Sequence, residues 1–237
     1  MTAVENISDR IRQIKERIAD AAEKSGRGAE DILLIAVSKL HTAEEVDAAA
    51  CAGITDVAEN KVQELCAKQP LVKADLNWHL IGHLQTNKVR QVVGKVKLLQ
   101  SVDSLHLAEE IDKRSAAAGI SSDVLIQVNA AGEAQKSGIA PELAEALVRD
   151  ISQQCSNVNI KGIMHIAPYA EDPEDVRIYF RQVRELYDRI GSLDIPRVSF
   201  ETLSMGMSGD FEVAIEEGSD AVRIGTAIFG ARDYGIK

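Results

Sequence analysis

The sequence predicts an α/β fold, a single (β/α)8 barrel of the TIM type that occupies residues 1–237. Eight short apolar segments recur along the chain, and a helical pattern follows nearly every one of them. Alternating strands and helices favour parallel pairing with right-handed crossovers, and eight parallel strands close a barrel. No Pro-, Gly- or Ser-rich linker divides the chain, and a barrel of this kind typically needs about 250 residues. One domain therefore accounts for the whole sequence.

The elements are justified in chain order. Residues 4–24 predict an amphipathic helix because apolar residues recur every three or four positions. The segment 31–37 is a continuous aliphatic run, which is typical of a strand buried on both faces. The other strands are predicted at 55–58, 77–81, 97–100, 123–128, 158–163, 197–200 and 220–224. Helices are predicted at 43–52, 60–68, 86–93, 104–118, 141–154, 173–191 and 208–217, with a last short helix from Thr226.

An open, doubly wound sheet is the competing topology for this order of elements. Such a sheet gathers its ligand contacts at one switch point, where the strand order reverses. In this chain the candidate site residues follow many different strands. A barrel brings the carboxyl ends of all its strands to one mouth, so the distribution of polar residues favours the barrel.

Composition bounds the partners and the compartment. The chain has 37 acidic and 27 basic residues, for a net charge of -10, which argues against a nucleic-acid or anionic membrane partner. Its three cysteines form no CxxC pair, which indicates reduced thiols. The N-terminus lacks the apolar region of a secretory signal, and no apolar run approaches about 18 residues. We therefore expect a cytoplasmic protein, with a monomer as the default state.

Lys39 carries the most chemical information in the sequence. It follows the apolar run of the first predicted strand, where a barrel places its chemistry. Desolvation lowers the proton affinity of an ammonium group, and a neutral amine can attack an aldehyde. Lys39 is therefore a candidate Schiff-base residue. The alternative is a solvated lysine just past a strand.

Polar residues follow several other strands. Asn60 follows the second strand and can cap the next helix. His79 and His83 are four residues apart, but they fall in a strand and a turn, so a zinc pair is not favoured and no metal is predicted. After the seventh strand, Ser208 can cap the following helix, which leaves Ser204 without a structural explanation.

The end of the eighth strand predicts a phosphate site. Gly225 allows close approach of the backbone, and Thr226 begins a helix whose free N–H groups can bind an anion. Arg223 ends an apolar strand, so we expect its guanidinium at the barrel mouth; the alternative is a pair with a neighbouring carboxylate. An amine, a phosphate cradle and an arginine together fit a phosphorylated aldehyde, of which pyridoxal phosphate is the common case.

These motifs resemble the pyridoxal phosphate homeostasis protein family of the YggS type, from about residue 5 to residue 233. The matching segments are Ala36-Val37-Ser38-Lys39, Glu59-Asn60 with Gln63-Glu64, Trp78-His79 through Gln85-Asn87-Lys88, Lys136-Ser137-Gly138, Leu203 through Ser208 with Asp210, and Arg223-Ile224-Gly225-Thr226. The resemblance implies a fold-type III barrel like the N-terminal domain of alanine racemase. It also implies pyridoxal 5'-phosphate as the cofactor, and intracellular buffering and supply of that cofactor without robust catalysis.

The same resemblance assigns the site residues. It implies a Schiff base on Lys39 and a phosphate site formed by Ser204, Gly225 and Thr226. It implies that Arg223 is the partner of the pyridine nitrogen, and Asn60 maps onto a pocket position. Apo-enzymes that depend on pyridoxal phosphate are the candidate protein partners.

Physical reasoning also favours a carrier, with two alternatives. An Arg beside the pyridine nitrogen weakens the electron sink because Arg does not accept its proton. A racemase needs two bases, and we expect no second domain after the eighth strand to supply one. A small single-domain racemase remains the first alternative, with Lys39 and one of His79, His165 or Tyr169 as its bases. The second alternative is a Schiff-base aldolase that uses Lys39 without a cofactor.

Overall fold

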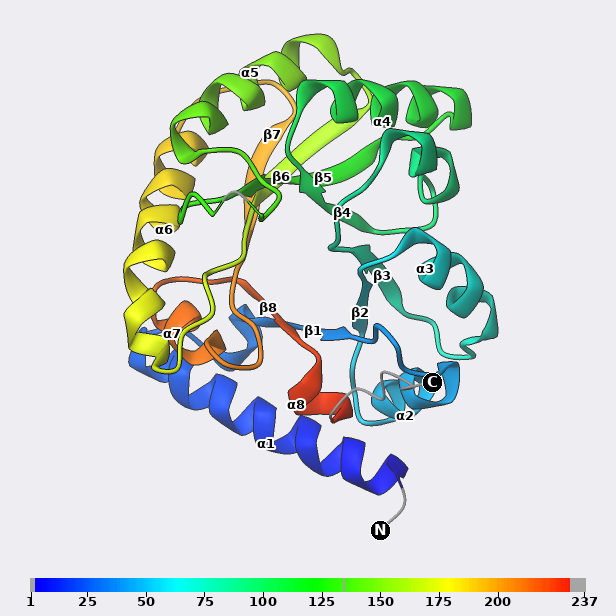
Figure 1. Ribbon diagram of the computed structural model, residues 1–237, viewed down its shortest axis with the longest axis vertical. Coiled ribbons are helices and arrows are strands. Elements are labelled where there is room, and N and C mark those ends of the chain that lie inside the picture. Colours follow the sequence, from blue (N-terminus) through cyan, green and yellow to red (C-terminus); the bar gives the residue numbers. More distant parts are fainter. Residues whose placement is uncertain (1–2, 134, 231–237) are drawn as a thin grey trace.

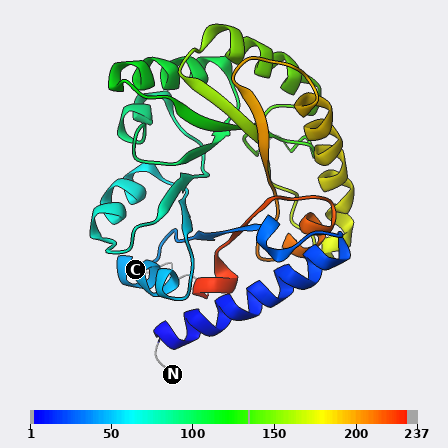
Figure 2. The same cartoon turned by 180° about the vertical axis from the view of Figure 1, so that it is seen from behind.

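The predicted eight-stranded parallel barrel is confirmed. A computed structural model describes residues 3–133 and 135–230, and their strands close on themselves in the order β1 to β8. Helices surround the barrel, as Figure 1 shows from one end and Figure 2 from behind. The extreme ends of the predicted domain, at 1–2 and 231–237, and residue 134 lie outside the described residues.

All eight predicted strands are present, with shifts at their ends. They are β1 (Leu33–Val37), β2 (Asp56–Glu59), β3 (Asn77–Leu80), β4 (Leu98–Val102), β5 (Ser122–Val128), β6 (Val158–His165), β7 (Val198–Ser204) and β8 (Ala221–Ile224). The largest shift is in β7, which was predicted to end at residue 200. The added segment contains Glu201 and Thr202, whose polar side chains interrupt the apolar pattern on which the prediction depended.

Most predicted helices are confirmed, and four segments differ in type or start. The α-helices are α1 (Ala3–Lys24), α2 (Ala43–Cys51), α3 (Val62–Lys68), α4 (Leu105–Ala118), α5 (Ala144–Gln154), α6 (Arg177–Gly191), α7 (Phe211–Glu216) and α8 (Thr226–Phe229). Short 3-10 turns are η1 (Ala29–Asp31), η2 (Gln69–Leu71), η3 (Thr86–Gln91), η4 (Pro141–Leu143) and η5 (Pro173–Val176).

The differences have local causes. The helix predicted at 86–93 is only the 3-10 turn η3, and Gly94, with a φ of 78°, redirects the chain soon afterwards. The helices predicted from residues 141 and 173 open with the proline turns η4 and η5, since a proline fits the first turn of a helix. The helix predicted from 208 begins at Phe211, because the Asp210 carboxylate accepts a hydrogen bond from the Met207 N–H and closes a turn first.

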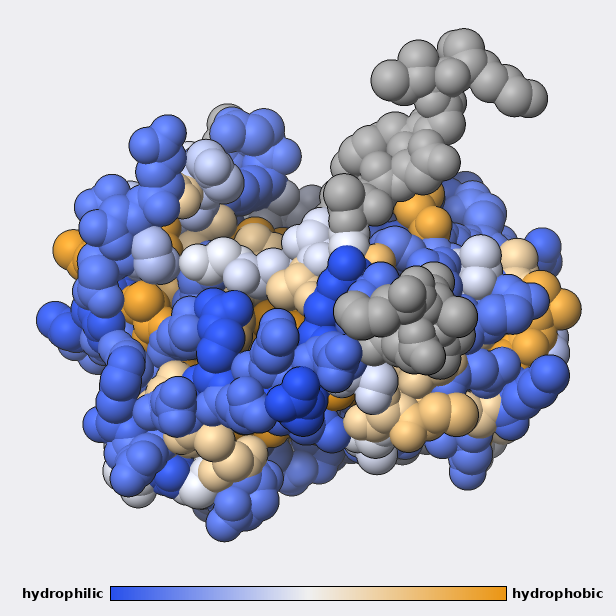
Figure 3. Space-filling view, turned by 90° about the horizontal axis from the view of Figure 1, so that it is seen from below, coloured by the Kyte–Doolittle hydropathy of each residue, from blue (hydrophilic) through white to orange (hydrophobic). Residues whose placement is uncertain are grey.

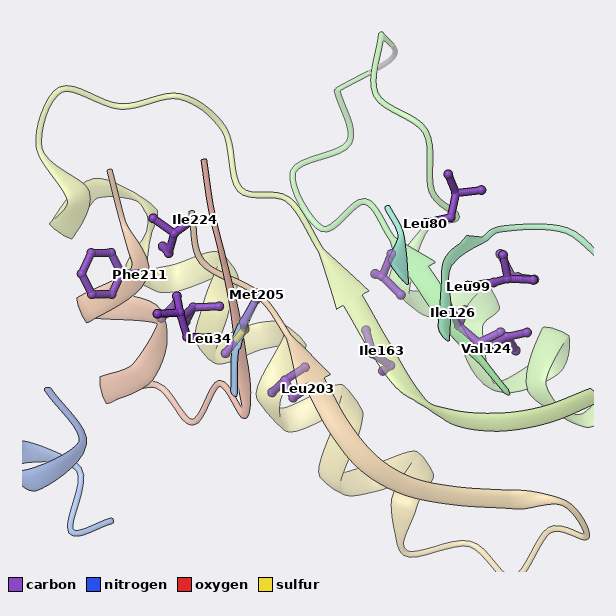
Figure 4. Packing of buried hydrophobic residues seen from close by; sticks show 14 of the residues in the cluster. Leu34, Leu80, Leu99, Val124, Ile126, Ile163, Leu203, Met205, Phe211 and Ile224 are labelled. Atoms are coloured by element: carbon purple, nitrogen blue, oxygen red, sulfur yellow. The ribbon is translucent and has the colours of Figure 1, made fainter. Parts of the chain in front are cut away.

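The apolar core lies in two layers. The larger layer fills the space between the strands and the surrounding helices, and Figure 4 shows Ile163 and Leu203 as parts of it on adjacent strands. Two smaller clusters lie apart from this layer: Ile35, Val37, Ala58 and Ala221 form one, and Leu98, Leu125 and Met164 form the other. These residues alternate along their strands with members of the larger layer, so they face the barrel interior.

This alternation positions the site. Side chains two residues apart on a strand share a face. Lys39 is two residues beyond Val37, Asn60 is two beyond Ala58, and Arg223 is two beyond Ala221. The inward-facing rows of β1, β2 and β8 therefore lead to these three polar residues at the carboxyl ends of the strands.

The outer surface is mainly polar on one side of the molecule. Helix α1 lies on the outside of the barrel beside α2, α7 and α8, along the lower edge of the view in Figure 1. The face seen from below, which includes α1, is largely hydrophilic with scattered hydrophobic residues (Figure 3). Across 3–133 and 135–230, no helix is long and apolar enough to cross a membrane.

Candidate functional site

A cavity of about 600 Å³ opens at the carboxyl ends of the strands. Loops after β1, β2, β3, β5, β6, β7 and β8 all contribute to its wall. Its polar lining residues are Lys39, Asn60, Lys136, Tyr169, Ser208, Asp210, Arg223 and Thr226, and its apolar wall includes Val37, Ile81, Ile166, Pro168, Val176 and Met207. The cavity thus offers an apolar wall with a few convergent polar groups, which is typical of a small-molecule site.

Five of the six predicted site residues line this cavity: Lys39, Asn60, Arg223, Gly225 and Thr226. Ser204 differs from the expectation that it faces a phosphate. It is fully buried and is not among the lining residues. Its hydroxyl donates to the Gln100 side-chain oxygen at 2.8 Å and accepts from Arg223 at 2.7 Å, so it is already engaged inside the barrel.

Ser208 lines the cavity where Ser204 was expected. Its Oγ accepts from the backbone N–H groups of Gly225 and Ala227, both at 3.4 Å. Ser208 was predicted to cap the following helix, but α7 begins at Phe211 with Asp210 in the capping position. Its position four residues past the last strand residue, inside a turn containing Gly206 and Gly209, was the available signal for a ligand-facing hydroxyl.

The backbone on both sides of Lys39 is held by hydrogen bonds. The Ser38 hydroxyl donates to Glu59 Oε1 at 2.7 Å, and the Ser38 carbonyl oxygen accepts from Lys68 Nζ at 2.6 Å. The Leu40 N–H donates to the Glu64 carboxylate, and Leu40 adopts a left-handed φ of 67°. Because residues 38 and 40 are both anchored, the Lys39 backbone has a defined position at the cavity.

Glu59, Glu64 and Lys68 form a partly buried ion-pair cluster, here called the lysine clamp. Lys68 Nζ lies 2.6 Å from Glu59 Oε1 and 3.1 Å from Glu64 Oε1. The Glu59 side chain is fully buried. Burial raises the pKa of Glu59, although hydrogen bonds from Lys68 and Ser38 oppose that shift. Removing one member of such a pair leaves an uncompensated buried charge, so the clamp is sensitive to substitution.

Arg223 forms the inner wall of the cavity. Its Nη1 donates to Ser204 Oγ and its Nη2 donates to the His165 carbonyl oxygen, both at 2.7 Å. Burial lowers the pKa of Arg223 to about 10, with the charge of Asp210 opposing the shift, so the side chain stays cationic at neutral pH. Within the described part of the chain, no carboxylate lies at ion-pair distance from this guanidinium, contrary to the alternative considered for it.

Asn60 presents an unsatisfied acceptor. Its side-chain oxygen is buried and has no hydrogen-bond partner within the protein, although the residue lines the cavity. Unsatisfied buried polar atoms are uncommon and call for an explanation such as a missing ligand. A molecule that donates a hydrogen bond would satisfy this oxygen.

The other candidate acid-base groups are distributed unevenly. His79 and His165 are buried away from the cavity lining, and burial lowers the pKa of His165 to about 4. Tyr169 lines the cavity. Lys136 brings a second amine to the wall and donates to the Ala167 carbonyl oxygen at 3.0 Å. Over residues 3–133 and 135–230, no cluster of His, Cys, Asp or Glu could hold a metal ion.

Comparison with known proteins identifies relatives over nearly the full chain. The family model of the alanine racemase N-terminal domain matches residues 9–233. The chain is 46% identical to a pyridoxal phosphate homeostasis protein of Aquifex aeolicus, over 97% of this chain and 100% of the relative. A protein of the same name from Pseudomonas aeruginosa is 41% identical, over 97% of both chains. The structure of PipY from Synechococcus elongatus with PLP bound has a TM-score of 0.82 and 34% identity, over 94% of this chain and 100% of PipY.

Proposed function

Because this chain belongs to the pyridoxal phosphate homeostasis protein family, within the alanine racemase N-terminal domain family, we propose that it binds pyridoxal 5'-phosphate on Lys39. The bound state is a Schiff base, formed by the Lys39 amine and the cofactor aldehyde with loss of one water. The observation that carries the proposal is the position of Lys39 in a cavity that also holds Arg223, Gly225 and Thr226. The role is intracellular homeostasis and supply of the cofactor.

The residues of the cavity fit this ligand. The Arg223 guanidinium is a donor that never accepts a proton, so it complements an unprotonated ring nitrogen. The orphan oxygen of Asn60 gives a donor group of the ligand a partner. The cavity volume of about 600 Å³ is ample for a single pyridoxal phosphate.

We assign the phosphate to Ser208, Gly225 and Thr226. All three line one side of the cavity, and the N–H of Gly225 is directed at Ser208 Oγ. Short side chains and the backbone N–H groups at the start of α8 suit an anion of this size. Ser204 then contributes indirectly, because its hydroxyl accepts a hydrogen bond from Arg223 and helps to orient that side chain.

We further propose that the protein is a carrier rather than an enzyme. Pyridoxal phosphate, when bound, supplies an electron sink for reactions of amino acids. A racemase would need a second base beside Lys39, and His79 and His165 lie outside the cavity lining. Tyr169 is the remaining candidate of the three, but its side chain is 92% exposed and is therefore poorly placed to act as a shielded base.

The first test is the absorption spectrum of the pure protein. We expect a visible band that disappears in Lys39→Ala, and a covalent adduct after borohydride reduction. Peptide mapping should place the adduct on Lys39. Mapping to Lys136, the other lysine of the cavity wall, would overturn the assignment. Failure to bind pyridoxal phosphate would favour the cofactor-free aldolase.

The second test separates a carrier from a racemase. The loaded protein is incubated in heavy water with alanine, serine and a wider amino-acid panel. We expect no multiple-turnover exchange, racemisation or keto-acid formation, while transfer of the cofactor to an apo-enzyme proceeds. Turnover at about 1 per second or faster, lost in Lys39→Ala, would promote the racemase. We propose as well that the protein is a monomer, which analytical sedimentation tests. Delivery of the cofactor to apo-enzymes is tested by the transfer assay.

A further inference from the structure

A chain of five buried polar residues crosses the barrel interior behind the cavity. Arg223 donates to Ser204 Oγ at 2.7 Å, and Ser204 donates to Gln100 Oε1 at 2.8 Å. Gln100 Nε2 lies 3.0 Å from His79 Nδ1, and His79 Nε2 lies 2.9 Å from Asp56 Oδ1. We call this set, from Arg223 to Asp56, the cross-barrel chain.

The cross-barrel chain spans the lumen rather than one edge of it. Arg223 and Ser204 belong to the adjacent strands β8 and β7, while Gln100, His79 and Asp56 belong to β4, β3 and β2. Because β7 and β4 are not neighbours in the closed barrel, the Ser204 to Gln100 hydrogen bond crosses the interior. Every member of the chain is at most 3% exposed.

The hydrogen bonds of the cross-barrel chain run in one direction. Arg223 can only donate, and the Asp56 carboxylate can only accept. With the Gln100 amide oxygen toward Ser204 and its NH₂ group toward His79, each intermediate residue accepts on one side and donates on the other. His79 is then the tautomer with its proton on Nε2 and an unprotonated Nδ1 that accepts from Gln100. Aligned hydrogen bonds in a low-dielectric interior polarise one another in the same sense.

Asp56 is built as the anionic end of the chain. It opens β2, at the end of the strand away from the cavity, and its Oδ2 accepts from Thr55 at 2.8 Å and Asn77 at 3.2 Å. Burial alone would raise the pKa of Asp56, but hydrogen bonds from His79, Thr55 and Asn77 hold it well below its ordinary value. The carboxylate is therefore charged throughout the neutral range.

Packing alone gives no reason for this arrangement. The lumen of a (β/α)8 barrel is usually filled by bulky branched residues, and each buried polar group costs free energy unless it is hydrogen-bonded. Here the polar groups satisfy one another and lead to a buried guanidinium with no carboxylate beside it in the described structure.

We propose that Asp56, His79 and Gln100 are positioning residues that act through Ser204 to fix the Arg223 guanidinium for recognition of an unprotonated ring nitrogen. This inference rests on the proposed pyridoxal phosphate site. The chain presents one oriented acceptor, Ser204 Oγ, to the guanidinium, and the His165 carbonyl oxygen presents a second. The remaining N–H donors of Arg223 therefore keep a fixed direction toward the cavity. The expected consequence is selectivity for the nitrogen atom of the ligand ring, rather than for its phosphate or its aldehyde.

The chain itself is tested without ligand. In ¹⁵N-histidine spectra of the ligand-free protein, assigned with His79→Gln, His79 should show a protonated Nε2 and a hydrogen-bonded, unprotonated Nδ1. Gln100→Leu should shift the Nδ1 resonance toward that of a free lone pair. A proton on Nδ1 in the wild-type protein would overturn the direction of the chain, whatever the protein binds.

The positioning role of the cross-barrel chain is tested with a pair of ligands, pyridoxal phosphate and the analogue in which carbon replaces the ring nitrogen. Gln100→Leu should weaken pyridoxal phosphate by about tenfold, the loss of one hydrogen bond to a charged group, and should leave the affinity for the analogue nearly unchanged. Ser204→Ala should do the same, and Ser204→Thr, which keeps the hydroxyl, should restore selectivity. If Gln100→Leu fails to fold, the Ser204 pair decides. Equal weakening of both ligands would show general damage and reject the positioning role.

Binding of neither ligand by the wild-type protein would instead reject the proposed function, while the histidine spectra would still decide the chain.

Discussion

The ammonium nitrogen of Lys68 lies 2.6 Å from the carbonyl oxygen of Ser38, so a side chain of α3 holds the backbone immediately before Lys39. The same nitrogen lies 2.6 Å from Glu59 Oε1, and Glu59 in turn accepts from the Ser38 hydroxyl. One buried ion pair thus fixes both the main chain and the side chain of Ser38, the residue next to Lys39. The position of the Lys39 backbone depends on the integrity of this pair.

Lys68→Met should destabilise the protein by about 3–5 kcal/mol at neutral pH, because it leaves Glu59 buried and unpaired. It should also slow formation of the borohydride-fixed adduct on Lys39, on the order of tenfold, since the amine loses its defined position. Urea unfolding and adduct mass spectrometry measure the two effects.

Lys97→Met is the matched control for this substitution. Lys97 also faces a buried carboxylate, with its Nζ 3.4 Å from Asp56 Oδ1, but its side chain is 54% exposed. Its loss should cost no more than about 1 kcal/mol and leave adduct formation unchanged. The deficit of Lys68→Met should shrink toward pH 4, where protonation of Glu59 removes the buried charge. A pH-independent deficit would contradict the clamp.

Ser208→Ala should weaken pyridoxal phosphate by about tenfold through the loss of one hydrogen bond to an anion, and should barely affect unphosphorylated pyridoxal. Ser204→Ala is the companion variant, four residues earlier on β7. Because Ser204 contacts Arg223 rather than the cavity, its loss should weaken both phosphorylated and unphosphorylated ligands. Fluorescence titration with the two ligands measures the ratios. If Ser204→Ala weakened only the phosphorylated ligand and Ser208→Ala weakened both, the phosphate would be assigned to Ser204 instead.

Stability should decline on the acid side because of His165. Its ordinary pKa of 6.5 falls to about 4 in the folded protein, chiefly by burial. The unfolded chain therefore binds a proton before the folded one does. The stability that the folded protein gains by keeping His165 neutral is fully present above pH 6.5 and is lost as the pH falls toward 4. The free energy of unfolding should fall by roughly 3 kcal/mol over this range.

His165→Gln should remove this component from the pH dependence of the unfolding free energy while keeping the backbone carbonyl that accepts from Arg223. His106→Gln is the control, because the His106 side chain is 81% exposed. Parallel stability curves for the wild type and His165→Gln between pH 4 and 6.5 would contradict the assignment.

Gly82→Ala should distort the cavity by displacing the backbone of Asn60. A Cβ at this position would overlap the carbonyl oxygen of Asn60 and lie 2.9 Å from its Cα, so the backbone of a cavity residue must move. We expect a loss of about 1–3 kcal/mol of stability together with weaker pyridoxal phosphate binding. Gly209→Ala, whose Cβ would meet nothing within 4 Å, should fold like the wild type. Thermal unfolding and ligand titration distinguish the two variants.

The barrel could be predicted from the sequence because most of its strands are buried on both faces, and several of them form aliphatic runs. The second half of β7 could not, since Glu201 and Thr202 break that pattern. The position of Lys39 could be predicted because it follows an aliphatic run, and the carboxyl end of a barrel strand can be located from such a local pattern. Whether Ser204 or Ser208 reaches the cavity depends on how far below the cavity floor the end of β7 lies, and no local sequence pattern predicts that distance.

The supporting residues were harder to foresee. Lys68 reads as an ordinary charged residue of an amphipathic helix, yet it is nearly buried because Glu59 and Ser38 approach it from other elements. Gln100 interrupts an apolar strand and was the visible signal for a polar interior. Its partners on β3 and β7 could be known only from the closed barrel, since they lie 21 and 104 residues away.

Tyr169 stands on the cavity wall with its ring in solvent, 92% exposed. An enzyme that shields a reactive species usually folds a loop or a large side chain over it. The Tyr169 ring therefore does not close the described part of the cavity, and under the proposed function the residence time of the ligand would depend on its bond to Lys39 rather than on closure of a lid. In kinetic terms the proposed carrier would be arranged for exchange: the chemistry of one amine would limit loading and unloading, and a receiving apo-enzyme would reach the ligand without displacing a cover.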